Sequence, residues 1–232
     1  MGFPEVEFLG HMVGGGKMYP TLDKIKALKD ATPPTTKKQM RSFIGLLSFY
    51  RRYVPNFAAI ACPLTDATKK GKPNIIEWTE AQVRAYDKLK HVLCSEPVLH
   101  LPDFDKPFFL QTDASDTGLG SILLQQEGQE KFPVLFLSRK LLPPERNYSV
   151  IEKECLALVW AIRSLDSYLQ GREFTVLTDH APLLYINKAK NENGRVLRWA
   201  LTLNHYRFRI QSVAGKDNHG PDFLSRCFDE NP

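Results

Sequence analysis

Four acidic residues in separate sequence contexts could together hold divalent metal ions. Two follow apolar, β-like runs, one lies early in a helix, and one opens a short helix near the C-terminal end: Asp113, Asp179, Glu154 and Asp222, respectively. Carboxylates at strand ends and helix starts can converge in space although they are far apart in sequence. A cluster of such oxygen ligands suits Mg²⁺ or Mn²⁺. Two such ions can cleave a phosphodiester by in-line displacement.

Two of the acids share the same local sequence. Asp113 follows Phe-Phe-Leu-Gln-Thr, and Asp179 follows Phe-Thr-Val-Leu-Thr, so each completes a Thr-Asp pair after an apolar run. We expect both at one edge of a sheet. A turn-forming role is the alternative for Asp113, although Asp116 fits that role more naturally. His180 could assist catalysis, but a surface or supporting role is favoured for it.

The helix expected from Ser149 offers two candidate ligands, Glu152 and Glu154. Ser149-Val-Ile-Glu152 is a capping box, which gives Glu152 a structural task. Glu154 is the better ligand because it lies on the flank of the apolar stripe, whereas Glu152 points further away. That stripe, which we expect to be buried, consists of Ile151, Cys155, Leu158, Ile162 and Leu165.

Asp222 follows Pro221, which suits the first position of a helix. An acid there faces the positive end of the helix dipole, so plain helix stabilisation would also explain it. The preceding loop, residues 214–220, is polar and cationic, as an active-site flap would be. The argument therefore rests on the set of four acids rather than on any one of them.

The elements that must position these acids differ between the two halves of the chain. The first half predicts a short hairpin turning at Gly14–Gly16, and then helices over 22–31, from Thr36 to about 50, over 57–69 with an interruption at Pro63, and from Thr79. The second half predicts β-type runs at 108–112, 120–124, 134–138, 174–178 and 206–213. We place the border in the proline-rich segment 96–107. Strands alternating with helices predict a mixed sheet with helices on its faces.

Composition fits a soluble globular protein with a polyanionic partner. The 232 residues are 43% hydrophobic and 25% charged, with a formal net charge of +5. The four cysteines lack zinc-ligand spacing, which favours reduced thiols. No apolar run reaches membrane-spanning length, and the N-terminus lacks a signal segment. We expect an intracellular protein with no membrane partner.

The motifs around the acids resemble the ribonuclease H domain of gypsy-class LTR retrotransposon and retroviral reverse transcriptases. They are Thr-Asp-Ala-Ser at 112–115, Glu-Lys-Glu-Cys-Leu-Ala at 152–157, Thr-Asp-His at 178–180 and Pro-Asp-Phe-Leu-Ser-Arg at 221–226. Phe-Leu-Gly-His at 8–11 resembles the segment around the primer grip of that family. The segments at 40–46, 49–57 and 97–99 look like its thumb and connection.

The resemblance implies an α/β fold over residues 101–232, with a ribonuclease H-like mixed five-stranded sheet and flanking helices. Residues 1–100 would form the end of the palm, the thumb and the connection, a mainly helical region. The implied activity is endonucleolytic cleavage of the RNA strand of RNA–DNA hybrids, leaving a 5′-phosphate. Asp113, Glu154, Asp179 and Asp222 would hold two Mg²⁺ ions, with Asp113 contacting both, and Mn²⁺ can substitute. Neither Lys216 nor His219 clearly matches the mobile histidine of many ribonucleases H, so no catalytic histidine is assigned.

Basic residues supply candidate contacts to the nucleic-acid backbone. Several cations lie on or beside the helix from Thr36, interleaved with aromatic residues, and they suit phosphates. A solvated helix face is the alternative, and the thumb resemblance favours binding. Arg195 and Arg198 share a helix face and form a second patch, whereas Trp199 is expected in the core. The candidate nucleic-acid-binding residues are Arg41, Arg51, Arg52, Arg195, Arg198 and Lys216.

The sequence lacks the Tyr-x-Asp-Asp turn that polymerase chemistry in this family needs, so we do not expect this chain alone to polymerise DNA. An upstream polymerase region is an expected partner, in a cytoplasmic reverse-transcription particle or in the nucleus. Two other hypotheses stay open. One is a catalytically inactive nucleic-acid-binding module from a decayed or domesticated element. The weaker one is an integrase-like strand transferase, which relies on three acids.

Overall fold

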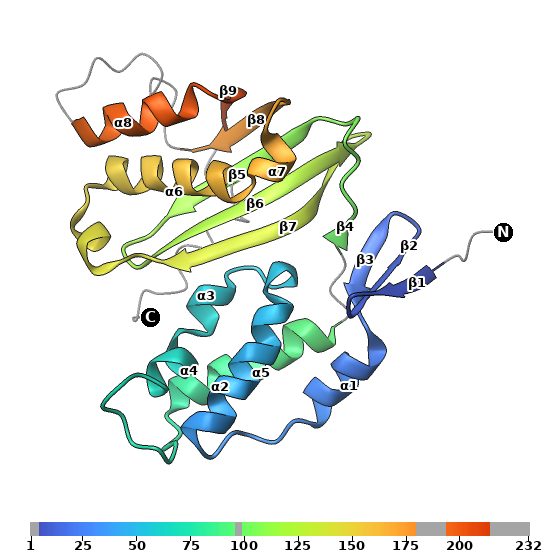
Figure 1. The fold of residues 1–232 in the computed structure, drawn as a ribbon, viewed down its shortest axis with the longest axis vertical. Coiled ribbons are helices and arrows are strands. Elements are labelled where there is room, and N and C mark those ends of the chain that lie inside the picture. Colours follow the sequence, from blue (N-terminus) through green and yellow to red (C-terminus); the bar gives the residue numbers. More distant parts are fainter. Residues whose placement is uncertain (1–4, 96–98, 180–193, 214–232) are drawn as a thin grey trace. The chain divides into compact units, whose positions relative to one another are not determined.

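The change from helical to β-rich sequence near residue 100 coincides with the border between two compact units. A computed structural model describes residues 5–95, 99–179 and 194–213. Residues 1–101 form the first unit and residues 102–232 the second (Figure 1).

The first unit contains a small antiparallel sheet. Its strands, in spatial order, are β1 (Glu5–Phe8), β2 (His11–Gly14), β3 (Lys17–Pro20) and β4 (Leu99–His100). Two-residue turns at Leu9–Gly10 and Gly15–Gly16 join the first three strands, and all four turn residues have positive φ. Such turns match the twist of the flanking strands, which is why glycine is favoured there. The glycine turn expected from the sequence is confirmed.

The described part of the first unit also contains the α-helices α1 (Leu22–Asp30), α2 (Lys37–Phe49), α3 (Phe57–Ile60), α4 (Cys62–Ala67) and α5 (Glu80–Cys94). The two long helices begin with capping boxes at Thr36 and Thr79, in which the threonine and a glutamine three residues later satisfy free N–H groups. The helix predicted over 57–69 is in fact two helices, because the regular helix is interrupted at Ala61. Pro63 lies at the start of α4, where a missing N–H costs nothing.

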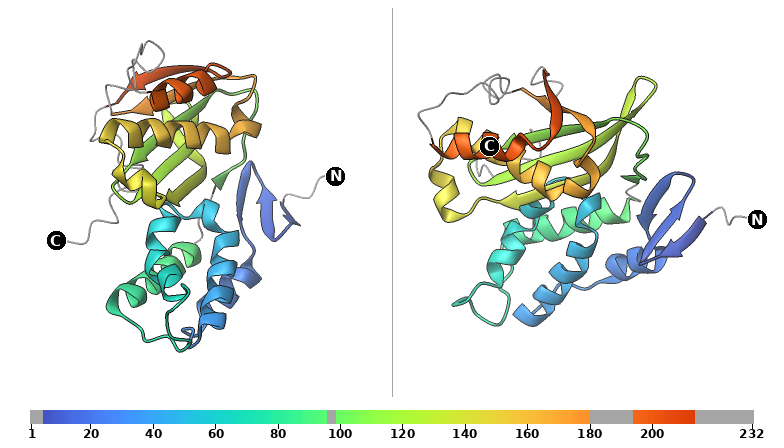
Figure 2. Two further views of the ribbon diagram at one scale, coloured as in Figure 1. Left: turned by 60° about the vertical axis from the view of Figure 1, so that its left-hand side comes forward. Right: turned by 45° about the horizontal axis from the view of Figure 1, so that its top comes forward.

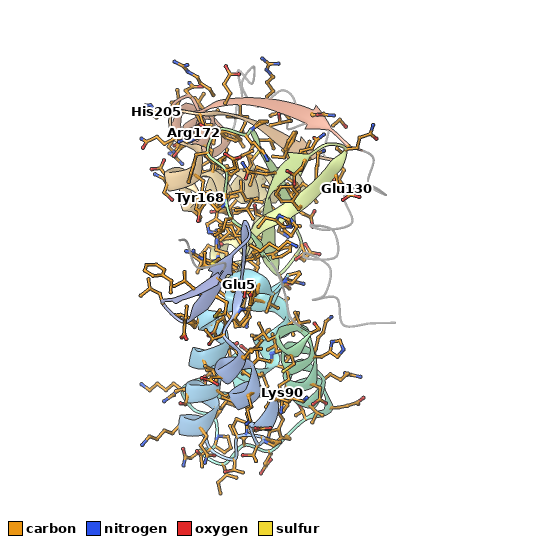
Figure 3. The ribbon with its side chains drawn as sticks, turned by 90° about the vertical axis from the view of Figure 1, so that its right-hand side faces the viewer. Glu5, Lys90, Glu130, Tyr168, Arg172 and His205 are labelled. Atoms are coloured by element: carbon orange, nitrogen blue, oxygen red, sulfur yellow. The ribbon has the colours of Figure 1, made fainter. Side chains whose placement is uncertain are left out.

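Side chains of α5 close the C-terminal end of α1. Tyr86 donates a hydrogen bond of 2.6 Å from its hydroxyl to the carbonyl of Ala31, and Lys90, labelled in Figure 3, donates to the carbonyls of Lys29 and Ala31. These carbonyls have no partners within the helix itself. The two side chains therefore fix the α1–α5 packing through polar contacts as well as through the core.

The second unit is built on a five-stranded mixed sheet. Its strands are β5 (Phe108–Ala114), β6 (Gly118–Glu127), β7 (Glu130–Lys140), β8 (Glu173–Thr178) and β9 (Arg207–Ser212), in the spatial order β7-β6-β5-β8-β9. The β7-β6-β5 part is antiparallel, while β5-β8 and β8-β9 are parallel. All five strands predicted from the sequence are confirmed, and most are longer than expected.

The second unit also contains the helices α6 (Val150–Ser164), α7 (Asp166–Leu169) and α8 (Gly194–Leu203). In Figures 1 and 2, α6 and α8 lie side by side. Buried Leu158 and Ile162 of α6 pack with Phe108 and Leu110 of β5 and with Val176 of β8. The stripe prediction holds from Cys155 onward, but Ile151 is 47% exposed. The buried part of α6 starts only at Lys153, so the first turn lies outside the packed core.

The segment that leads into β5 is tied to the same unit. Arg172 donates to the carbonyl of Phe104 at 2.8 Å, and the ring of Tyr168 stacks on that of Phe104 (Arg172 and Tyr168 are labelled in Figure 3). Buried Gln125 of β6 exchanges hydrogen bonds with the backbone N–H and carbonyl of Asp103. The start of β5 is thus fixed at several points.

Two smaller expectations concern cysteines and membranes. Cys62, Cys94 and Cys155 have free thiols, as predicted, while Cys227 lies outside the described residues. Within the described ranges, no helix combines the length and apolar character needed to cross a membrane.

Candidate active site

Two of the four predicted acids lie at one edge of the sheet. Strands β5 and β8 are parallel neighbours, and Gln111 pairs with Leu177 in their register. Two positions beyond this pair come Asp113 and Asp179. Because parallel strands run in the same direction, both acids reach the same sheet edge. Asp113 is 7% exposed, whereas Asp179, just past the end of β8, is exposed.

Helix α6 brings Glu154 to the end of β5. The Glu154 side chain is buried, and its Oε1 accepts a hydrogen bond of 3.3 Å from the backbone N–H of Ala114, the residue after Asp113. Its other oxygen, Oε2, is also buried and accepts no hydrogen bond from the residues that the structure describes. A buried carboxylate oxygen in this state is costly unless a cation or a donor joins it.

The charges of the acids act on one another. Burial, together with the negative charges of Asp113 and Asp179, raises the pKa of Glu154 to about 9, although the N–H of Ala114 opposes this effect. The folded protein therefore favours the protonated form of Glu154 unless positive charge is supplied. A bound divalent cation would supply that charge.

Within the described ranges, no three His, Cys, Asp or Glu side chains lie close enough together to hold a metal ion. The electrostatic coupling of Glu154 to both aspartates does not conflict with this, because Coulomb interactions act over longer distances than metal–ligand bonds. The fourth acid, Asp222, lies outside the described residues, as do His180, Lys216 and His219. The carboxylates present, and the buried Oε2 of Glu154, fit a hard divalent ion such as Mg²⁺.

Comparison with known proteins identifies this unit. Residues 103–206 match the family described as "RNase H-like domain found in reverse transcriptase". This part of the chain is an RNase H-like domain of a reverse transcriptase.

Relatives of the whole chain are retroelement polyproteins. The chain is 41% identical over 222 residues to the retrovirus-related Pol polyprotein from transposon 297 of Drosophila melanogaster, covering 96% of this chain and 20% of that protein. It is 38% identical over 232 residues to the Pol polyprotein from transposon gypsy of the same organism, covering 95% of this chain and 22% of the relative. The chain therefore spans about a fifth of the length of these relatives.

The fold matches solved structures of a viral enzyme. The foamy viral protease-reverse transcriptase in complex with RNA/DNA hybrid has a TM-score of 0.77 at 23% identity, over 90% of this chain and 29% of that one. At this level of identity the match establishes the fold alone. The prediction of an RNase H-like mixed sheet is confirmed.

The two glutamates at the start of α6 make different contacts in the RNase H-like domain. Glu152 closes the capping box with Ser149, as predicted, and its Oε1 also accepts a hydrogen bond of 2.6 Å from Arg195 of α8. Glu154 alone faces the end of β5. The assignment of Glu154 as a metal ligand stays a prediction, and its position is consistent with that role.

Sequence reasoning missed Lys153, the residue between these glutamates. Its side chain is 8% exposed, and its Nζ donates a hydrogen bond of 2.6 Å to Asp116 in the β5–β6 turn. A lysine at the start of a helix normally predicts a solvated charge. The available signal was its place within a segment that also carries Cys155 and Leu156, both buried.

The predicted nucleic-acid-binding arginines of the first unit have different surroundings. Arg41 is exposed, and its guanidinium donates to the carbonyl of Thr68 at 2.9 Å, just past the C-terminal end of α4. Arg51 lies over the ring of Phe57. Arg52 is exposed, and its charge lowers the pKa of His11, after the larger effect of burial. The structure therefore gives Arg41 a structural contact besides its predicted role.

The arginines of α8 also differ from each other. Arg195 is held by Glu152 and lies 4.1 Å from the centre of the Tyr148 ring, whereas Arg198 is exposed. Trp199 packs against the core, as predicted. Nucleic-acid binding by these arginines and by Lys216 stays a prediction, and Lys216 lies outside the described residues.

Proposed function

We propose that this chain is a two-metal-ion endoribonuclease that cleaves the RNA strand of RNA–DNA hybrids, as part of a retroelement reverse transcriptase. The observation that carries the proposal is the buried carboxylate of Glu154, held on the N–H of Ala114 beside Asp113, with Asp179 at the neighbouring strand end. Membership of residues 103–206 in the RNase H-like family supports the same reading.

The site residues would act as holders of metal and charge. Asp113, Glu154, Asp179 and Asp222 would hold two Mg²⁺ ions, or Mn²⁺ in their place. When bound, such ions supply activation of the attacking water and stabilisation of the leaving 3′-oxygen. The N–H of Ala114 orients Glu154, since it holds one carboxyl oxygen and leaves the other available. The buried setting strengthens every electrostatic interaction made there.

Nucleic acid is the proposed partner. The similar foamy viral enzyme was solved with double-stranded DNA and with RNA/DNA hybrid. In this chain, exposed Arg52 and Arg198 are available for backbone phosphates. Their contribution would be largely independent of base sequence and would weaken with salt.

The direct test is cleavage of a labelled RNA–DNA hybrid by the purified chain in Mg²⁺, with double-stranded DNA as the comparison substrate. We expect cleavage of the RNA strand only, and its loss in Asp113→Asn. Asp105→Asn, which changes an exposed acid outside the cluster, is the matched control and should cleave normally. Cleavage that survives Asp113→Asn would refute the mechanism. Hybrid binding without cleavage in either Mg²⁺ or Mn²⁺ would instead identify a catalytically inactive binding module.

A further inference from the structure

Three successive residues at the start of α6 each hold a different element. Glu152 accepts a hydrogen bond from Arg195 of α8, Lys153 donates one to Asp116 of the β5–β6 turn, and Glu154 accepts one from the N–H of Ala114 at the end of β5. The contact of Lys153 with Asp116 has no task in the activity proposed above.

The β5–β6 turn is closed by its own hydrogen bonds. The N–H of Ser115 donates to the carbonyl of Gly118 at 2.9 Å, and the Ser115 hydroxyl accepts hydrogen bonds from the N–H groups of Thr117 and Gly118. The carbonyl of Thr117 also accepts a hydrogen bond from the N–H of Leu141, just after β7. Asp116 therefore lies between residues whose hydrogen bonds connect it to the backbone beside Asp113 and to the end of β7.

The pairing of Lys153 with Asp116 is asymmetric in burial. The side chain of Lys153 is 8% exposed and that of Asp116 is 82% exposed, while Nζ and Oδ1 are 2.6 Å apart. A buried ammonium group is costly unless it is paired, whereas an exposed carboxylate tolerates loss of its partner. The protein therefore buries a charged side chain one residue before Glu154, and Asp116 is the partner that makes this burial tolerable.

We propose that Lys153 is a positioning residue: by holding Asp116, it keeps the β5–β6 turn against α6 and so sets the spacing between the carboxyls of Asp113 and Glu154. This inference rests on the proposed nuclease function, because that spacing matters only if the two acids share metal. Lys153 itself would touch neither metal nor substrate.

The key comparison is between Lys153→Met, which keeps the apolar stem and removes the charge, and Lys153→Arg, which keeps the charge. Asp116→Asn removes the charge of the other partner, but its amide oxygen can still accept a hydrogen bond from Nζ, so the buried ammonium of Lys153 is not left without a partner. Arg84→Met is the matched control, because Arg84 and Glu80 form an ion pair of 2.8 Å on the surface of α5, in the first unit.

Two measurements are needed. The first is the Mg²⁺ concentration that gives half-maximal hybrid cleavage, together with Mn²⁺ affinity by calorimetry. Loss of a residue that orients a metal ligand weakens metal affinity by roughly tenfold to a hundredfold, so we expect a shift of this size in Lys153→Met and Asp116→Asn. Lys153→Arg should recover most of the affinity, and Arg84→Met should match the parent. At saturating Mg²⁺, Lys153→Met should regain most of its cleavage rate.

The second measurement is amide hydrogen exchange over residues 113–118, which requires neither metal nor activity. We expect faster exchange there in Lys153→Met and not in Arg84→Met. Unchanged metal affinity, or unchanged exchange, in a folded Lys153→Met protein would overturn the positioning role while leaving the nuclease proposal standing. If the parent neither binds metal nor cleaves hybrid, the nuclease proposal fails. Faster exchange in Lys153→Met would then support only the mechanical part of the inference.

Discussion

In metal-free protein, Glu154→Gln should be more stable than the parent at neutral pH. Burial raises the pKa of Glu154 to about 9, with further contributions from the charges of Asp113 and Asp179. A buried acid of this kind favours folding while it is protonated. Its contribution is fully present below its ordinary pKa of 4.5 and is lost as the pH rises towards about 9. Glutamine, which is neutral and similar in shape, would not lose this contribution.

The size of the effect follows from the same shift. Between these two pKa values, each pH unit removes about 1.4 kcal/mol from the free energy of unfolding. From pH 5.5 to pH 7.5 the parent should therefore lose about 3 kcal/mol relative to Glu154→Gln. This difference is large compared with the effect of most surface substitutions.

The assay is urea unfolding in EDTA, followed by tryptophan fluorescence. In a Trp78→Phe background the remaining tryptophans, Trp160 and Trp199, both belong to the second unit, so the signal reports that unit alone. Glu130→Gln, at the exposed β6–β7 turn, is the control for loss of an acid. Mg²⁺ should stabilise the parent more than Glu154→Gln, because the cation compensates the buried charge.

The reasoning would be refuted if the stabilities of the parent and Glu154→Gln ran parallel from pH 5.5 to pH 7.5 in EDTA. An equal difference in the free energy of unfolding between Glu130→Gln and the parent would also refute it, because the effect would then come from general charge rather than from burial. We expect the stability difference from the parent to grow with pH in Glu154→Gln alone, and to shrink when Mg²⁺ is added.

Three further predictions concern stability. Gln125→Ala should cost about 2 to 4 kcal/mol, because it leaves the backbone groups of Asp103 without their buried partner; urea unfolding of the second unit measures this. Ser149→Ala should cost about 1 kcal/mol through loss of the cap of α6, and Ser149→Thr should largely keep it in the same assay. Leu9→Asn should stabilise the first unit by about 1 kcal/mol, since Leu9 is exposed with a φ of 49°, and unchanged thermal unfolding would contradict this.

Local signals predicted most elements correctly. The capping box at Ser149 and the helix starts at Thr36 and Thr79 were predicted, because the hydrogen bonds of such caps close within three residues. The same holds for the glycine turn between β2 and β3. The segment 57–69 was predicted as one helix that Pro63 interrupts. In the structure the first helix ends before Ala61, and Pro63 lies in the first turn of the second helix.

Burial was harder to predict because it depends on what lies opposite. Ile151 follows the helical spacing of the stripe, yet it is exposed, since the spacing does not reveal where the packed core begins. Arg41 was assigned to phosphate binding from its charge. Its contact with the carbonyl of Thr68 depends on how α2 and α4 pack, and the helical spacing of α2 does not contain that information.

The candidate site also has a part that local sequence patterns predict and a part that depends on distant contacts. The Thr-Asp endings of two apolar runs predicted that Asp113 and Asp179 share a sheet edge, and the parallel pairing of β5 and β8 places them there. Lys153 was overlooked because lysine is almost always exposed, and because its partner, Asp116, is 37 residues away in sequence. Asp116 lies in a turn that hydrogen bonds between Ser115 and Gly118 close. A buried cation next to a predicted metal ligand therefore depends on a contact that no local spacing pattern contains, and such a residue is best found by asking what pairs with each buried charge.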